Sequence, residues 1–219
     1  MAEQTPRIAI LASGSGTTAE AVIRATQPRE DRFLLQAHVG VIICNNSDAG
    51  IFKRVERLNH ELGLSIPVLH ISKRTHPRGG APYGQQSPQE AEAIAAACEG
   101  SDMLAGLGYM KKVGGPVLDL AMLKINAHPG PLPATRALYA EAVQEEVLRQ
   151  GLPYSGPSVN LLDENYDTGE LLAYTPVAVQ PGDTPTSLRL RVQDAEREVM
   201  PIIFNNLLHN GFIDPTGRR

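Results

Sequence analysis

Short apolar runs that alternate with segments of helical composition constrain the fold of this chain more than any other feature. Residues 7–12, 36–44 and 66–71 are apolar and rich in β-branched residues, which is typical of buried strands. Residues 19–25 and 49–62 lie between these runs and carry apolar residues at helical spacing. Strands that alternate with helices in this way predict an α/β fold with a doubly wound, mostly parallel sheet.

The same alternation continues through the middle of the chain. Residues 103–107 and 123–127 form two further apolar runs, and we expect both to be strands. Residues 89–97 and 136–149 have helical composition. Residues 77–88 are rich in Gly, Pro and Gln, which predicts an exposed loop.

The pattern changes in the last third of the chain. Residues 158–162 and 171–179 are strand-like and are joined by a polar loop, which predicts an antiparallel hairpin at the edge of the sheet. Thr184-Pro185 then provides a hydroxyl cap and a proline at the start of a long C-terminal helix. We find neither an internal repeat nor a linker, so we expect one domain over residues 1–219.

Charge and cysteine usage limit the partners that the chain can have. The formal net charge is −4, and the longest basic block is Lys111-Lys112, so we expect neither nucleic acid nor an anionic membrane as partner. Cys44 and Cys98 lack metal-ligand spacing, so we expect buried thiols and no metal. The N-terminus has no signal-peptide core and no apolar stretch is long enough to span a bilayer, which predicts a cytoplasmic protein.

A glycine-rich loop follows the first predicted strand and opens a helix. Its residues Gly14, Ser15, Gly16, Thr17 and Thr18 expose backbone amides at the positive end of that helix, which suits a phosphate group. The loop is equally compatible with a tight turn that binds nothing. A dinucleotide site would require an acidic residue at the end of the second strand, where the sequence instead reads CNN, and the Walker lysine is also absent.

Polar side chains also follow the strand predicted at residues 123–127. Asn126 and His128 are two positions apart, so they point the same way in an extended segment, at the sheet edge where parallel sheets bind ligands. Asp167, in the polar loop of the hairpin, would stabilise a protonated His128 and orient its ring for proton transfer. A simpler alternative without catalysis remains open. In it, His128 is a surface histidine, Asn126 caps the loop, and the loop with Asp167 is an ordinary solvated hairpin. The loop fails the EF-hand pattern because Thr168 precedes Gly169.

Three segments together resemble the formyltetrahydrofolate-dependent formyltransferases. They are SGSGTT after the first strand, NAHPGPLP after a later strand, and the loop DENYDTGELL. The resemblance implies a Rossmann-like fold and an enzyme that transfers a formyl group from formyltetrahydrofolate, a co-substrate, to the amine of a small phosphorylated acceptor. It requires no metal, and it leaves open whether the protein is a monomer or a homodimer.

The resemblance also implies roles for individual residues. Asn126, His128 and Asp167 correspond to the catalytic residues, residues 14–18 to the site of the acceptor phosphate, and Glu196 to a contact with the acceptor. The residues expected to line the folate pocket are Tyr109, Met110, Lys111, Val113, Asp163, Glu164, Asn165 and Tyr166.

The sequence departs from the family pattern near the predicted acceptor site and at the folate rim. Gly130 and Pro131 stand where the family usually has serine and leucine, and Ser155 and Asn160 stand where it usually has histidines. Two alternatives therefore stay open. One is a formyltransferase relative with another acceptor, such as a sugar-nucleotide amine or water. The other is a non-catalytic folate- or nucleotide-binding protein on the same scaffold.

Overall fold

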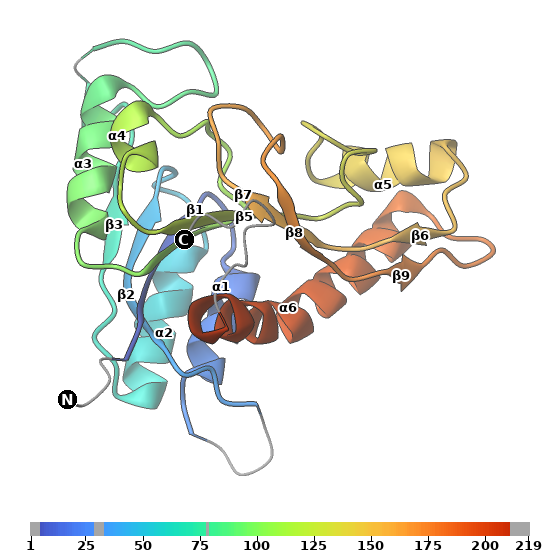
Figure 1. Cartoon of the computed structure of the whole chain (residues 1–219), viewed down its shortest axis with the longest axis horizontal. Helices are drawn as coiled ribbons and strands as arrows, with labels where there is room; N and C mark the ends of the chain where they lie inside the picture. Colours follow the sequence, from blue (N-terminus) through green and yellow to red (C-terminus); the bar gives the residue numbers. More distant parts are fainter. Residues whose placement is uncertain (1–4, 29–32, 78, 211–219) are drawn as a thin grey trace.

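The computed structural model describes residues 5–28, 33–77 and 79–210 (Figure 1). The ends of the predicted domain and residue 78 of the predicted loop lie outside the described residues. The elements, in chain order, are β1 (Arg7–Ala12), α1 (Thr17–Ala25), β2 (His38–Cys44), α2 (Ile51–Leu62), β3 (Val68–His70), α3 (Pro88–Cys98), β4 (Met103–Leu107), α4 (Gly115–Leu118), β5 (Leu123–His128), α5 (Glu141–Arg149), β6 (Tyr154–Ser155), β7 (Ser158–Leu161), β8 (Leu171–Tyr174), β9 (Val177–Ala178) and α6 (Pro185–His209).

The main sheet has the strand order β3-β2-β1-β4-β5-β7-β8. Strands β1 to β5 pair in parallel, whereas β7 and β8 pair antiparallel at one edge. Both the mostly parallel sheet and the antiparallel edge hairpin are therefore confirmed. The strand order changes direction between β1 and β4. In open α/β sheets, ligands bind at such a switch point, beside the carboxyl ends of the two strands.

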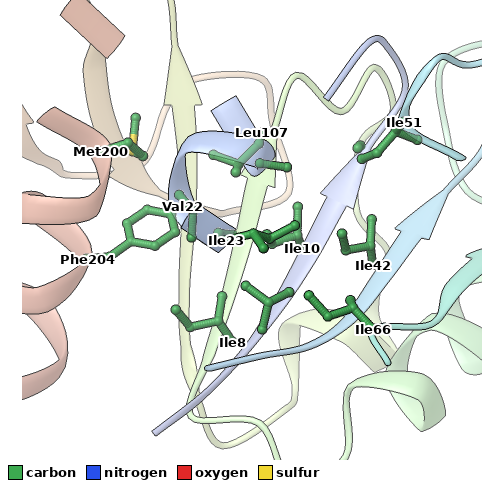
Figure 2. Packing of buried hydrophobic residues seen from close by; sticks show 14 of the residues in the cluster. Ile8, Ile10, Val22, Ile23, Ile42, Ile51, Ile66, Leu107, Met200 and Phe204 are labelled. Carbon is green, nitrogen blue, oxygen red and sulfur yellow. The ribbon is translucent and has the colours of Figure 1, made fainter. Parts of the chain in front are cut away.

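Both faces of the sheet are covered by helices, as the continuous apolar strands require. Side chains of β1 alternate between the two faces: Ile8 and Ile10 pack in one core cluster and Ala9 and Leu11 in the other. Figure 2 shows the first cluster, where Phe204 of α6 packs beside the sheet. Residues of α1, α2 and α6 belong to this cluster, and residues of α3 and α4 belong to the second.

The helix predicted over residues 136–149 begins later than expected. Helix α5 starts at Glu141, and the segment before it is irregular, with positive φ angles of 60° at Ala137 and 53° at Ala140. The helical composition of this segment is overridden by contacts with the loop that carries Asp167, since the Ala137 amide and the Arg136 side chain both bond to Asp167.

The strand predicted over residues 171–179 is divided in two. Strand β8 pairs with β7, whereas β9 pairs with β6 in a separate two-stranded sheet. Pro176 lies between them, and because proline has no N–H group it cannot continue a hydrogen-bonded ladder.

The long C-terminal helix is confirmed, as is its start. The hydroxyl of Thr184 caps α6 by accepting from the amide of Ser187, and Pro185 occupies the first turn. The helix contains Pro201 and continues to His209. Within the described part of the chain, we find no helix whose length and apolar character would suit a membrane span.

Glu20 joins α1 to α2, and we expect its ion pairs to dominate the acid sensitivity of this helix pair. Its carboxylate accepts from Arg24 at 2.8 Å, from Arg57 at 2.9 Å and from Arg54. Burial acts to raise the pKa of Glu20, but the hydrogen bonds from the three arginines outweigh it and lower the pKa to about 2. A depressed pKa contributes stability above the pKa of the unfolded chain, and this contribution is lost as the pH falls towards 2.

Glu20→Gln should therefore lower the free energy of unfolding by about 2 kcal/mol at pH 7, and by much less near pH 2. Urea unfolding at both pH values measures this difference. The matched control is Glu56→Gln, on an exposed position of α2, which should change little at either pH. An equal loss at both pH values for Glu20→Gln would show that its charge is not the cause.

Candidate active site

The structure brings Asn126, His128 and Asp167 together at the carboxyl end of β5. The Asn126 side-chain amide (Nδ2) donates to Oδ1 of Asp167 at 2.9 Å, and Nδ1 of His128 lies 3.3 Å from Oδ2 of the same carboxylate. The His128 side chain is 3% exposed and that of Asp167 is 9% exposed. Because solvent is largely excluded, the attraction between a protonated imidazole and the carboxylate is stronger here than at a surface.

Backbone contacts hold Asp167 in place. Its φ angle is 56°, a left-handed conformation that Asp tolerates better than most residues. The Ala137 amide donates to Oδ2 of Asp167 at 3.1 Å, and Nε of Arg136 donates to its main-chain carbonyl at 2.9 Å. The Ala137 amide stabilises the charged carboxylate, and the Arg136 contact fixes the backbone that carries it.

A buried polar network supports the turn that follows His128. The Ser158 hydroxyl donates to the carbonyl of Gly130 at 2.7 Å, and the Gln144 amide donates to the carbonyl of Pro129 at 2.7 Å. Gln144 in turn accepts from the Ser155 hydroxyl at 2.6 Å. Ser155, Ser158 and Gln144 are fully buried, so this network restricts the turn to one conformation.

A cavity of about 550 Å³ opens next to these residues, and Asn126, His128 and Asp167 line part of it. Its walls are the segment after β4, which contains Gly108, and the loop between β7 and β8. The cavity is lined by the predicted folate-pocket residues Tyr109, Met110, Lys111, Val113, Asp163, Asn165 and Tyr166. Glu164 is not among its lining residues.

The segment after β4 is held by side chains from α3 and its N-terminus. The Lys111 ammonium pairs with Glu90, whose carboxylate is fully buried and also accepts from the Ser87 amide at 2.7 Å. The Tyr109 hydroxyl accepts from Gln86 at 3.1 Å, and burial raises the pKa of Tyr109. This wall of the cavity is therefore preorganised, and the Lys111 charge is paired with that of Glu90.

The glycine loop lies at the same edge of the sheet. Gly16 caps α1 with a φ angle of 74°, and the Thr18 hydroxyl donates to Oε1 of Glu196 at 2.7 Å, which joins the loop to α6. Burial raises the pKa of Glu196, while the Thr18 hydrogen bond acts to lower it. Neither the loop nor Glu196 lines the 550 Å³ cavity, so the structure places this region outside that cavity.

A model of the family described as formyl transferase matches residues 6–203. The chain belongs to the formyl transferase family. This formyltransferase uses formyltetrahydrofolate as its co-substrate. Among the described residues, no group of three or more His, Cys, Asp or Glu side chains is placed to hold a metal ion.

Curated relatives of this formyltransferase include a phosphoribosylglycinamide formyltransferase of Bacillus subtilis. It is 27% identical over 203 residues, which cover 92% of this chain and 94% of the relative. The bovine trifunctional purine biosynthetic protein adenosine-3 is 28% identical over 196 residues, but the match covers only 18% of that longer protein against 89% of this chain.

Solved structures show the same architecture. A phosphoribosylglycinamide formyltransferase from Bacillus halodurans superposes with a TM-score of 0.76 at 27% identity, covering 95% of this chain and 98% of that one. A glycinamide ribonucleotide transformylase from Geobacillus kaustophilus also gives 0.76, at 28% identity, covering 94% of this chain and 100% of that one. The Rossmann-like formyltransferase fold is therefore confirmed.

Sequence reasoning missed several polar residues around the three central side chains of this formyltransferase. Thr135 is fully buried, and its hydroxyl lies 2.9 Å from Nε2 of His128. Asn160 lies opposite Asn126 across the β5–β7 pair, with its Oδ1 3.4 Å from Nδ2 of Asn126. The sequence marked Asn160 only as a departure from the family pattern, and neither contact is encoded locally, because each joins residues that only the folded chain brings together.

Proposed function

We propose that this formyltransferase transfers the formyl group of formyltetrahydrofolate to the amine of glycinamide ribonucleotide, a step of de novo purine biosynthesis. The convergence of Asn126, His128 and Asp167 beside a cavity of about 550 Å³ carries the proposal. Two further observations support it: the names of the relatives, and a glycine loop at a helix N-terminus, which suits the acceptor phosphate.

In the proposed reaction the neutral amine of the acceptor attacks the formyl carbon, so that a carbon–nitrogen bond forms and the formyl oxygen becomes an oxyanion. The positive charge of protonated His128 stabilises the oxyanion electrostatically, and the side-chain amide of Asn126 stabilises it as a hydrogen-bond donor. The contact from Asn126 to Asn160 is 3.4 Å long, against 2.9 Å to Asp167. Because a long hydrogen bond is weak, the amide hydrogen that faces Asn160 is the one that is available to the oxyanion.

The remaining step breaks the bond between the formyl carbon and the folate nitrogen. The attacking amine loses a proton and the departing folate nitrogen gains one, so the proton balance closes without any added acid or base. Asp167 relays this proton from the amine to the folate nitrogen, directly or through water. We assign Glu196 to the acceptor side, because it bonds to the glycine loop through Thr18.

The proposal is tested by mixing the purified protein with formyltetrahydrofolate and glycinamide ribonucleotide and following the release of tetrahydrofolate. We expect turnover that depends on the acceptor, with formylated glycinamide ribonucleotide as product. Equal turnover in a blank without acceptor would identify water as the acceptor. Turnover only with a sugar-nucleotide amine would show that the acceptor differs from glycinamide ribonucleotide while the formyl-transfer reaction is the same. Folate binding without turnover would favour a binding protein.

A further inference from the structure

The imidazole of His128 is enclosed by protein groups on both of its nitrogens. Nδ1 faces the Asp167 carboxylate at 3.3 Å, and Nε2 lies 2.9 Å from the Thr135 hydroxyl. Thr135 is fully buried, so water does not compete for this contact. The Thr135 hydroxyl is therefore the hydrogen-bond partner of Nε2.

The Thr135 hydroxyl has a second partner, the carbonyl of Pro131, at 3.1 Å. A hydroxyl carries one hydrogen and two lone pairs, so it can either donate to Nε2 or accept from it. When His128 is protonated, Nε2–H donates to the hydroxyl, and the hydroxyl hydrogen points to the Pro131 carbonyl. When His128 is neutral with its hydrogen on Nδ1, the hydroxyl rotates and donates to Nε2.

Rotation of the hydroxyl leaves no buried polar group without a partner. The Pro131 carbonyl keeps a hydrogen bond from the Thr135 amide at 3.2 Å in both states. Asp167 accepts from Nδ1–H in both states as well. Because a buried unpaired donor or acceptor is costly, this arrangement allows the ring to change its charge without moving.

Gly130 makes the space that Thr135 needs. A Cβ atom at position 130 would lie 2.4 Å from Oγ1 of Thr135 and 2.4 Å from Cγ1 of Val143. Serine, which the family pattern has at this position, therefore does not fit while Thr135 occupies its place. Gly130 therefore leaves the space in which the Thr135 hydroxyl contacts His128.

We infer that Thr135 is a positioning residue that holds the His128 ring in one orientation in both protonation states, its hydroxyl turning between the Pro131 carbonyl and Nε2. The inference rests on the proposed role of His128 in formyl transfer. The other charged groups that act on His128 are Asp167 from the β7–β8 loop and Glu196 from α6, together with Arg136, which bonds to the Asp167 carbonyl. Substitutions at Thr135 leave all three in place.

The first test compares Thr135→Val with Thr135→Ser. Valine keeps the shape but removes the acceptor for Nε2–H, so we expect kcat to fall about 10-fold and the KM for the folate to change less than threefold. The charged ring is the state that loses its partner, so the alkaline limb of the kcat–pH profile should move to lower pH by about one unit. Serine keeps the hydroxyl and should retain most of the activity and the original profile.

The matched control is Thr26→Val, which removes a hydroxyl that donates to the Ile23 carbonyl at 2.7 Å, away from the cavity. It should leave kcat and its pH profile unchanged. Equal losses in Thr135→Val and Thr135→Ser would assign the effect to packing and overturn the inference. An unchanged kcat and pH profile in Thr135→Val would overturn it as well.

A second readout does not require activity. Long-range ¹H–¹⁵N NMR of the histidine side chains reports which ring nitrogen of His128 carries a hydrogen at each pH. We expect the wild type to show Nδ1–H throughout and to gain Nε2–H on protonation, with protonation moved to lower pH in Thr135→Val, or in Thr135→Ala if the valine variant does not fold. A wild-type neutral form with its hydrogen on Nε2 would overturn the inference. If the protein lacks formyl transfer but shows the expected NMR behaviour, the proposed function fails while the positioning role stands.

Discussion

Replacement of His128 by alanine is expected to lower kcat for formyl transfer by about 10²- to 10⁴-fold, the range associated with loss of a positioned acid–base group. The substitution removes the imidazole that faces Asp167 and leaves this carboxylate, 9% exposed, without its partner at 3.3 Å. The oxyanion of the proposed reaction then keeps the Asn126 amide as a donor but loses the nearby positive charge of the imidazole. Steady-state kinetics at saturating concentrations of both substrates measures the loss.

His60→Ala is the matched control for this prediction. His60 lies in the last turn of α2 on an exposed position, so its removal should leave kcat unchanged. Thermal unfolding of both variants separates an effect on chemistry from an effect on folding. A folded His128→Ala enzyme with kcat within a factor of two of the wild type would rule out the proposed role of His128.

The second large effect is expected at Gly169, two residues after Asp167. A Cβ atom at this position would lie 2.0 Å from the carbonyl oxygen of Leu161, which is backbone and cannot turn aside. Gly169→Ala must therefore push β8 away from β7 and displace the loop that carries Asp167. Because a misplacement of about 1 Å can cost about 100-fold in rate, we expect kcat to fall at least that much, with weaker folate binding.

Gly115→Ala provides the comparison for Gly169→Ala. A Cβ atom at Gly115 has one neighbour within contact range, Oδ2 of Asp119 at 4.0 Å, so alanine fits there and activity should be kept. Folate binding is followed by fluorescence or calorimetry, and kcat by tetrahydrofolate release. If Gly169→Ala retained normal kcat and normal folate affinity, the position of the Asp167 loop would not limit catalysis.

The parallel part of the fold could be predicted from the sequence because the patterns that indicate it are local. Strands such as β1 and β4 are continuous apolar runs that end in glycine-containing loops, and the helices between them carry apolar residues at a helical period. The segment Asn126-Ala127-His128 was also readable as a candidate site. It combines an amide and an imidazole, two residues apart, with the carboxyl end of a strand.

Other features were not readable because they depend on contacts between distant residues. The irregular segment before α5 has helical composition, yet Arg136 and Ala137 bond to Asp167, 31 and 30 residues away. Sequence reasoning also did not separate Glu164, which does not line the cavity, from its neighbours in the loop, which do. Neighbours in a polar loop point in different directions, and composition does not distinguish the residues that face the cavity.

The sequence by itself determined the α/β class, the loops that follow the parallel strands and the residue types available for formyl transfer. These features could be predicted because hydrophobic periodicity and short motifs are properties of neighbouring residues. Only the tertiary structure decided which groups complete the site. Thr135 reaches Nε2 of His128 because Gly130 has no Cβ atom, and Asn160 reaches Asn126 because β7 pairs antiparallel with β5. Hydrogen bonds of this kind depend on sub-ångström packing between segments, which no local pattern encodes.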